Sequence, residues 1–141
     1  MKRKIVNKIV LTAVCLSMTF GACGMTSIAA SSTQSQDKIG GQYAYGSCSY
    51  SQKTATSITS HNVGSYKYAK LRASYRSGNE IKPSNVMDNT STSAGVNAQA
   101  VATISSDSLD YFLGCIGSHT VTYGGITWTG STSVGGNYYG W

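Results

Sequence analysis

The segment HTVTYGGITW at residues 119–128 constrains the fold of this chain more than any other feature. Two alternating runs flank a Gly-Gly pair, which is typical of a two-residue β-hairpin turn. Pairing Tyr123 with Ile126 places Val121 opposite Trp128, with all four side chains on one face and only Thr on the other. Turn and alternation agree on one register, so we predict a hairpin whose apolar face lies in a core.

Several other segments alternate with the period of two that is typical of half-buried strands. Short strands with Gly-rich turns predict an all-β fold, either an antiparallel β-sandwich or a small barrel. A change in aromatic parity predicts a bulge at Gly46. The predicted strands are 94–104, 65–76 with Ala69, Leu71, Ala73 and Tyr75 inward, 42–50, and a weak polar strand at 53–60; residues 109–116 fit either a strand or a helical turn.

The first thirty residues have the pattern of a secretory signal peptide. Residues 2–8 hold four of the eleven Lys and Arg, and a mostly apolar run from Ile9 to Ala22 precedes small residues that end at Ala30. We therefore expect a secreted, extracellular protein cleaved near Ala29 or Ala30. Two alternatives are a lipid anchor at Cys23 and an uncleaved membrane anchor.

We expect residues 31–141 to form a single β domain with a flexible leader at 31–39 and a long loop at 77–93. Its Ile, Leu, Val and Phe are few, but ten Tyr and two Trp supply apolar area for a core. Without the signal peptide the net charge is +2, because seven Lys and Arg and all five acids remain. That small charge excludes a strongly basic protein that binds nucleic acid.

Two cysteines, Cys48 and Cys115, remain after cleavage. Cysteines of exported proteins usually pair, so we predict a Cys48–Cys115 disulfide. The alternative is a reactive thiol at Cys115 with His119 as its base.

Few groups are available for catalysis. His61 and His119 lie in different segments and lack the spacing of metal ligands. Asp107 and Asp110 fit helix or turn capping better than a carboxylate pair. We therefore expect no enzymatic activity, no metal and no cofactor.

Two groups of residues are candidates for binding. Aromatic and cationic side chains, Lys67 among them, alternate along the 65–76 strand. Such a strip suits sugars, an anionic cell surface or a single-stranded nucleic acid. Aromatic residues also end the chain and suit an interface or a partner groove. The candidates are Tyr66, Tyr68, Lys70 and Arg72 in the strip, and Tyr138, Tyr139 and Trp141 at the end.

The run Gly40-Gly41-Gln42-Tyr43-Ala44-Tyr45-Gly46, together with Tyr138-Tyr139, resembles the lactococcin-type secreted bacteriocins. The resemblance covers about ten residues. Tyr43 stands where that family usually has Trp. The resemblance implies a small exported β-sandwich that interferes with cell-wall synthesis.

These observations favour a secreted, non-enzymatic protein that binds a cell-surface glycan, another envelope component or a protein. One alternative is a bacteriocin-like antimicrobial effector that acts on the bacterial envelope. A structural coat component is another. The small net charge and the lack of a cationic amphipathic helix argue against general membrane lysis.

Overall fold

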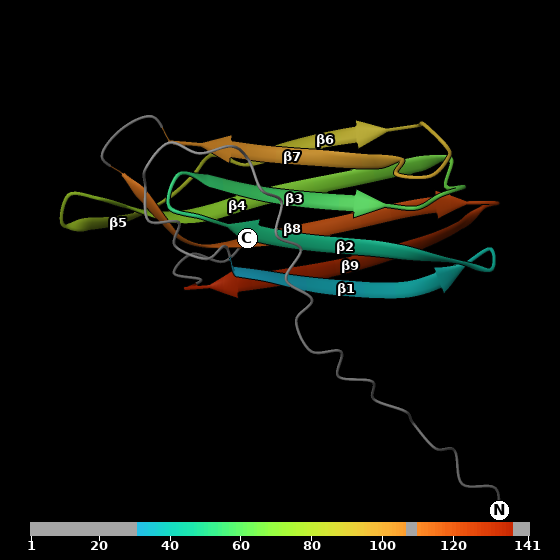
Figure 1. Cartoon of the computed structure of the whole chain (residues 1–141), viewed down its shortest axis with the longest axis horizontal. Helices are drawn as coiled ribbons and strands as arrows, with labels where there is room; N and C mark the ends of the chain where they lie inside the picture. Colours follow the sequence, from blue (N-terminus) through green and yellow to red (C-terminus); the bar gives the residue numbers. More distant parts are fainter. Residues whose placement is uncertain (1–30, 107–109, 137–141) are drawn as a thin grey trace, which may run out of the picture.

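The computed structural model of the chain describes residues 31–106 and 110–136, and this part is all β. Its strands form two antiparallel sheets that pack face to face as a β-sandwich (Figure 1). Sheet A has the order β1-β2-β3-β7, and sheet B has the order β5-β4-β8-β9 with β6 also paired to β4. The strands are β1 (Ser31–Ile39), β2 (Gln42–Tyr50), β3 (Thr54–Ser60), β4 (Tyr66–Ser77), β5 (Glu80–Pro83), β6 (Met87–Ser91), β7 (Gln99–Ser105), β8 (Tyr111–Tyr123) and β9 (Ile126–Gly135).

The chain passes between the two sheets three times. It crosses after β3, after β6 and after β7, whereas β1–β2, β2–β3, β4–β5 and β8–β9 are hairpins within one sheet. The crossings after β3 and β6, and the β1–β2 and β8–β9 turns, all lie at one end of the sandwich (Figure 1, right). Strands β6 and β7 lie side by side along the edge, where the Asn89 side chain donates a hydrogen bond to the Val101 carbonyl at 2.9 Å.

The predicted hairpin at 119–128 is confirmed in its turn and its register. Tyr123 pairs with Ile126 and Val121 with Trp128. Both turn glycines have positive φ, as a tight hairpin of this twist requires. The placement of Ile126 in the core is wrong, because this side chain is 56% exposed at the end of the sandwich.

The prediction for the 65–76 strand is confirmed as β4. Ala69, Leu71 and Ala73 are buried, and Tyr75 packs against the same core. The polar strand at 53–60 is β3, whose inward positions are Ala, Ser and Thr. The 94–104 strand is shorter than predicted, because β7 begins at Gln99. Residues 94–98 lie in the connection before it, which contains a turn.

Two segments expected to lack regular structure are strands. Residues 31–39 are not a flexible leader but β1, which pairs with β2 along its whole length. Residues 77–93 are not one long loop, because they contain β5 and β6, both paired to β4. All three lie at sheet edges and are largely polar, so they lack the apolar alternation that marks a half-buried strand.

The predicted bulge at Gly46 is also wrong. The β1–β2 and β2–β3 registers run through Gly46 without a shift. The aromatic parity changes because Tyr43 and Tyr45 face outward, while Tyr50 packs against the core. Gly46 meets a different need: an added Cβ would lie 2.2 Å from Cγ of His119, so only glycine leaves room for that ring.

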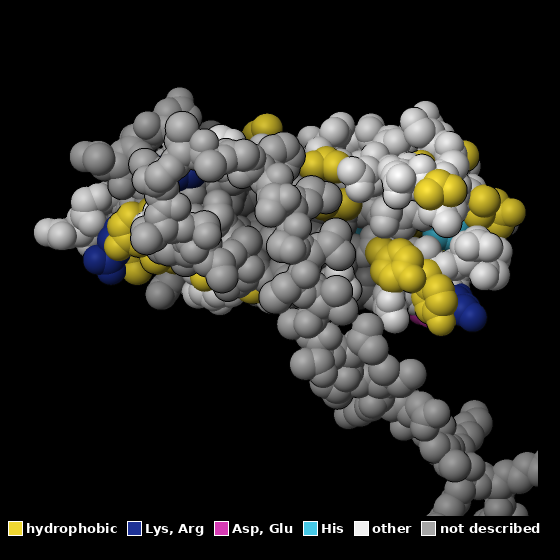
Figure 2. Space-filling view, viewed as in Figure 1, with side chains coloured by type: hydrophobic (Ala, Val, Ile, Leu, Met, Phe, Trp, Pro, Cys, Tyr) yellow, Lys and Arg dark blue, Asp and Glu magenta, His cyan; other side chains and the backbone are white. Residues whose placement is uncertain are grey.

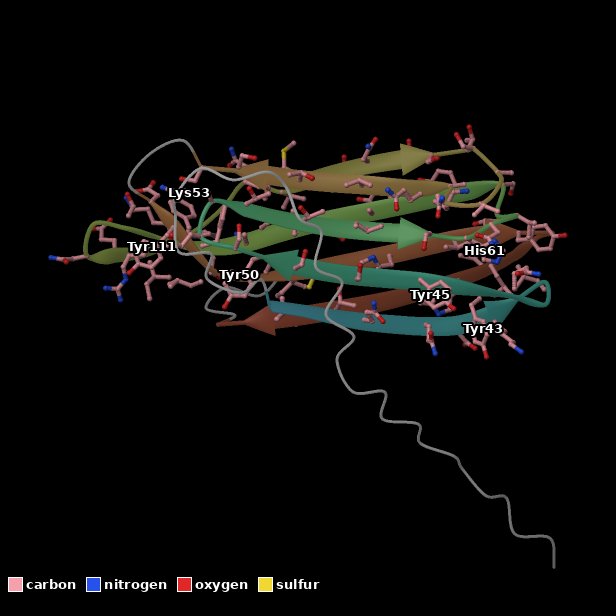
Figure 3. All side chains as sticks on the ribbon, in the orientation of Figure 1. Tyr43, Tyr45, Tyr50, Lys53, His61 and Tyr111 are labelled. Carbon is pink, nitrogen blue, oxygen red and sulfur yellow. The ribbon has the colours of Figure 1, made fainter. Side chains whose placement is uncertain are left out.

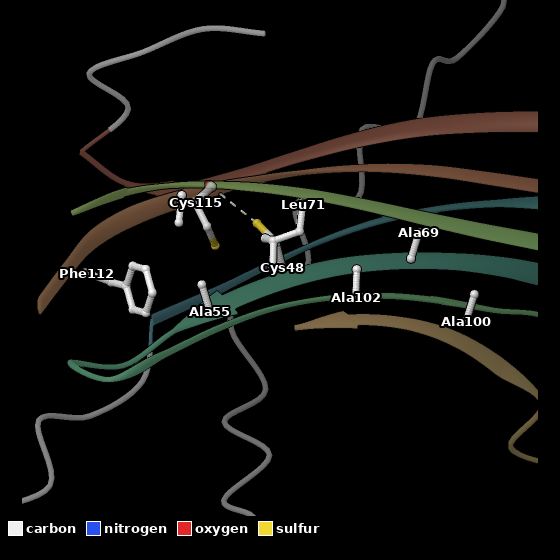
Figure 4. Packing of buried hydrophobic residues seen from close by; sticks show 9 residues of the cluster. Cys48, Ala55, Ala69, Leu71, Ala100, Ala102, Phe112 and Cys115 are labelled. Atoms are coloured by element: carbon white, nitrogen blue, oxygen red, sulfur yellow. Dashed lines mark hydrogen bonds between the residues drawn. The ribbon is translucent and has the colours of Figure 1, made fainter. Parts of the chain in front are cut away.

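The predicted disulfide is not formed. Cys48 and Cys115 are buried, free thiols that face each other between the sheets in the main core cluster (Figure 4). The Cys48 thiol donates to the Cys115 carbonyl at 3.6 Å, and the Cys115 thiol donates to the Ser49 carbonyl at 3.4 Å. Each sulfur therefore behaves as a small apolar group with a weak donor.

Candidate functional site

The predicted strip lies on the outer face of sheet B. Tyr66 is exposed, whereas Tyr68, Lys70 and Arg72 are half-buried. Because β6 on one side and β8 on the other both pair with β4, the strip is in the middle of the sheet and not at an edge. Three of its four side chains thus have limited contact with solvent.

The neighbouring carboxylate of Asp88 occupies the Tyr68 hydroxyl and adds a negative charge to the strip. The Tyr68 hydroxyl donates a hydrogen bond to Oδ2 of Asp88 at 3.1 Å, and Asp88 pairs with Lys70 in the β4–β6 register. Burial, the hydrogen bond to Asp88 and the charge of Asp88 raise the pKa of Tyr68. The strip therefore combines both charge signs and is not a simple cationic surface.

Lys67 does not belong to this surface, although it lies between Tyr66 and Tyr68 in the sequence. Its side chain is fully buried on the inner face of β4, opposite Val121. Its ammonium donates to the carbonyls of Gly64 at 2.8 Å and Ser93 at 2.5 Å. Burial lowers the pKa of Lys67, because a charged amine is poorly solvated there.

Several predictions from the sequence fall on residues outside the described part of the chain. They concern the signal segment 1–30 with Cys23, Asp107, and the aromatic residues of the chain end, Tyr138, Tyr139 and Trp141. The terminal aromatic surface therefore stays a prediction from sequence.

A polar cluster around His119 lies buried between the sheets. The Thr59 hydroxyl donates its proton to the Tyr68 carbonyl at 2.8 Å. Its oxygen also lies 2.9 Å from Nδ1 of His119, and because its proton is already used, it accepts a hydrogen bond from Nδ1–H. Nε2 of His119 is then the acceptor for the Thr132 hydroxyl at 2.7 Å. The hydrogen bonds thus select the neutral Nδ1–H form of the ring, and burial lowers the pKa of His119 to about 4.

This arrangement does not support the alternative of a Cys115–His119 dyad. Both ring nitrogens of His119 are engaged by threonines. The hydrogen bond with Cys48 and burial raise the pKa of Cys115, which keeps its thiol protonated. A nucleophilic cysteine needs a lowered pKa and access to solvent, and Cys115 has neither.

The most prominent exposed aromatic pair is Tyr43 and Tyr45, near the start of β2 and next to the Gly40-Gly41 turn. They are 43% and 42% exposed, and their ring centroids are 5.8 Å apart with an angle of 38° between the planes. Nζ of Lys38 lies 4.8 Å above the centre of the Tyr43 ring. The two rings lie together on the outer face of sheet A (Figure 3), where Figure 2 shows apolar atoms beside a cationic side chain.

The outer face of sheet A around these rings is mostly polar and mostly uncharged. Antiparallel partners share a face, so Gln36 and Ser60 lie beside Tyr45 across the β1–β2 and β2–β3 pairs. Farther along the same face the outward residues are Gln34, Ser47, Ser49, Thr56, Ile58, Gln99, Val101 and Thr103. Amide and hydroxyl groups therefore surround two stacking rings.

The sequence around this pair contains a local signal for its exposure. In Tyr43-Ala44-Tyr45-Gly46, small residues alternate with aromatic ones. In a strand, this pattern places small residues in a crowded interior and leaves the rings outside. Ala44 and Gly46 are indeed buried, and Gly46 faces the His119 ring.

Across residues 31–106 and 110–136, no three His, Cys, Asp or Glu side chains converge as metal ligands would. Nor do these residues include a helix with the length and hydropathy needed to span a membrane.

No family model, curated protein or solved structure matches this chain.

Proposed function

We propose that this protein is exported and acts without catalysis, by binding glycan on the outside of a cell envelope. The observation that supports this function is the Tyr43–Tyr45 pair on the outer face of sheet A, where Lys38 is the one charged neighbour in the β1–β2 pairing. A sugar ring presents an apolar C–H face that stacks on an aromatic ring, and it presents hydroxyl groups around its rim. Tyr combines an apolar ring with a polar group, and Gln36 and Ser60 beside it can hydrogen-bond to hydroxyls.

The test compares two double variants in binding to whole cells and to insoluble cell-wall polysaccharide. We expect Tyr43→Ala/Tyr45→Ala to weaken binding about 30-fold, since two stacking contacts at about 1 kcal/mol each sum to about 2 kcal/mol. Tyr66→Ala/Tyr68→Ala is the matched control, because it removes two tyrosines from the outer face of sheet B. Both variants should keep the melting temperature of the parent within a few degrees.

Three results would oppose this proposal. If the Tyr66/Tyr68 variant alone loses binding, the strip on sheet B is the binding surface. Filaments of purified protein that bind no cells would favour a structural coat. Undiminished binding by both variants would remove both aromatic surfaces from consideration.

The bacteriocin-like alternative is supported by one observation. The residues that carry the resemblance, 40–46, include the exposed pair Tyr43 and Tyr45. An antimicrobial effector of this kind should inhibit growth of related bacteria, and the Tyr43→Ala/Tyr45→Ala variant should not. Absence of inhibition by the parent protein at micromolar concentration would refute this alternative.

Export itself is tested by the intact mass of the protein in culture medium. Cleavage after Ala29 or Ala30 predicts a product that begins at Ala30 or Ser31. A product that retains residues 1–29, or one that carries a lipid on Cys23, would contradict the proposal.

A further inference from the structure

One end of the sandwich is built from segments without charged residues. Four segments meet there: 40–45, 61–66, 92–98 and 123–127, and none of them contains Asp, Glu, Lys or Arg. We call this region the uncharged end. The opposite end differs, because Lys53, Glu80, Lys82 and Asp110 lie in or next to its turns.

Backbone contacts show that the four segments form one unit. The Gly95 amide donates to the Asn62 carbonyl at 2.6 Å, which joins 92–98 to 61–66. The Ser65 amide donates to the Thr122 carbonyl at 3.0 Å, which joins 61–66 to the β8–β9 hairpin. Gly40 packs so closely on Tyr123 that an added Cβ would overlap its ring.

Apolar side chains project from this end. Val96 is 83% exposed, more than any other large apolar side chain of the described residues, and Ile126, Val63 and Tyr66 are also exposed. Val96 occupies the second position of a turn closed by the Ala98 amide and the Gly95 carbonyl at 3.1 Å. The next residue, Asn97, has φ of 70°, a left-handed conformation that such turns assign to Gly or Asn.

Buried side chains join the segments at the base of the uncharged end. The buried ammonium of Lys67 donates to Gly64 of one loop and to Ser93 of the other, and so fixes the two crossings relative to each other. The His61 ring, also buried, donates from Nε2 to the Ile39 carbonyl at 3.3 Å and packs against Tyr123. Apolar side chains held in this way lose little conformational freedom when they bind.

We propose that the uncharged end inserts into the interfacial region of a lipid bilayer. Three separate loops present the exposed aliphatic side chains of Val63, Val96 and Ile126 at this end. Tyr43, Tyr45 and Tyr66 belong to the same segments, and aromatic residues of this kind are typical of membrane interfaces. The charged residues of β1, Asp37 and Lys38, are set back from the Gly40-Gly41 turn. Lys38, above the Tyr43 ring, is placed to meet headgroup phosphates.

A lipid surface fits this end better than a protein partner. Protein interfaces have a polar rim, and their charged groups fix the orientation of the partner. Here the exposed side chains come from loop apices without charge, so the interaction should depend on apolar area and vary little with salt. This inference goes beyond glycan binding, because it concerns a different ligand and rests on the aliphatic side chains of the loop apices, although Tyr43 and Tyr45 lie next to both surfaces.

The test is flotation of the purified protein with vesicles of phosphatidylcholine, alone or mixed with phosphatidylglycerol. We expect Val96→Asp and Ile126→Asp each to lower the bound fraction at least about tenfold on both kinds of vesicle. Val86→Asp is the matched control, because Val86 is 45% exposed but lies between β5 and β6, away from this end. A Val96→Trp variant should show a shift of its emission to shorter wavelength when vesicles are added.

Each outcome bears on the inference. Failure of the parent protein to float, or equal loss of flotation in Val86→Asp, would overturn it. Capture of a protein partner that depends on Val96, without flotation, would overturn it in favour of a protein ligand. Cell-wall polysaccharide binding is measured on the same variants and should be unchanged, so the two proposals can fail separately.

Discussion

Acidification should destabilise this protein through His119. Burial lowers the pKa of His119 to about 4 from its ordinary value of 6.5, and the ring is neutral, with Nδ1 donating to Thr59 and Nε2 accepting from Thr132. In the unfolded chain the ring takes up a proton near pH 6.5, while the folded protein resists protonation until about pH 4. The unfolded state thus binds more protons between these values, and stability falls as the pH falls.

The magnitude follows from the size of this shift. The pKa of His119 is about 2.5 lower in the folded protein than in the unfolded chain, which corresponds to about 3 kcal/mol of the free energy of unfolding. This stabilisation is present in full above pH 6.5 and is lost by about pH 4. Domains of this size are stable by about 5–15 kcal/mol, so this loss is large. The measurement is the free energy of unfolding from urea titrations at several pH values across this window.

A variant separates His119 from other titrating groups. His119→Gln keeps a hydrogen-bonding side chain but cannot take up a proton in this range. It should be less stable than the parent near neutral pH by about 1–3 kcal/mol, because it replaces two well-placed hydrogen bonds. Its stability should depend less on pH than that of the parent. If the parent is equally stable at both ends of the window, or if the variant shows the same pH dependence, the assignment of this effect to His119 is refuted.

Three further predictions concern the core. Gly46→Ala should destabilise the protein by about 1–3 kcal/mol in urea titrations, because its Cβ would lie 2.2 Å from Cγ of the His119 ring; unchanged stability would contradict this close packing. Trp128→Ala should lower the free energy of unfolding by about 3–5 kcal/mol by the same measurement, because the ring is buried with Val121 and Ile39. A loss below about 1 kcal/mol would contradict the burial of this ring. The thiols of Cys48 and Cys115 should react with a thiol reagent only after unfolding, and a native protein without free thiols would contradict the reduced pair.

The edge strands show why part of the fold could not be predicted from the sequence. β4 and the β8–β9 hairpin alternate apolar and polar residues because one face is buried, so their period and register can be predicted locally. β1 and β6 lie at sheet edges, and neither carries a run of apolar residues in alternation. Their place depends on hydrogen bonds to β2 and β4, which no local pattern encodes.

The burial of side chains in β4 could likewise be predicted only in part. Alternation correctly placed Ala69, Leu71 and Ala73 inside, but it does not reveal that Lys67 on the same face is buried as well. The cost of burying its ammonium is offset by the carbonyls of Gly64 and Ser93, and Ser93 lies 26 residues away. A partner so distant becomes known only when the loops are brought together.

The sequence by itself determined that this chain forms antiparallel strands, and it determined the register of one hairpin. These properties depend on the period of buried side chains and on the φ values that glycine permits, and both are local. Only the tertiary structure decided that His119 is neutral and buried, and that four uncharged segments meet at one end. These properties require contacts between residues far apart in the chain, which exist only once the two sheets have packed together.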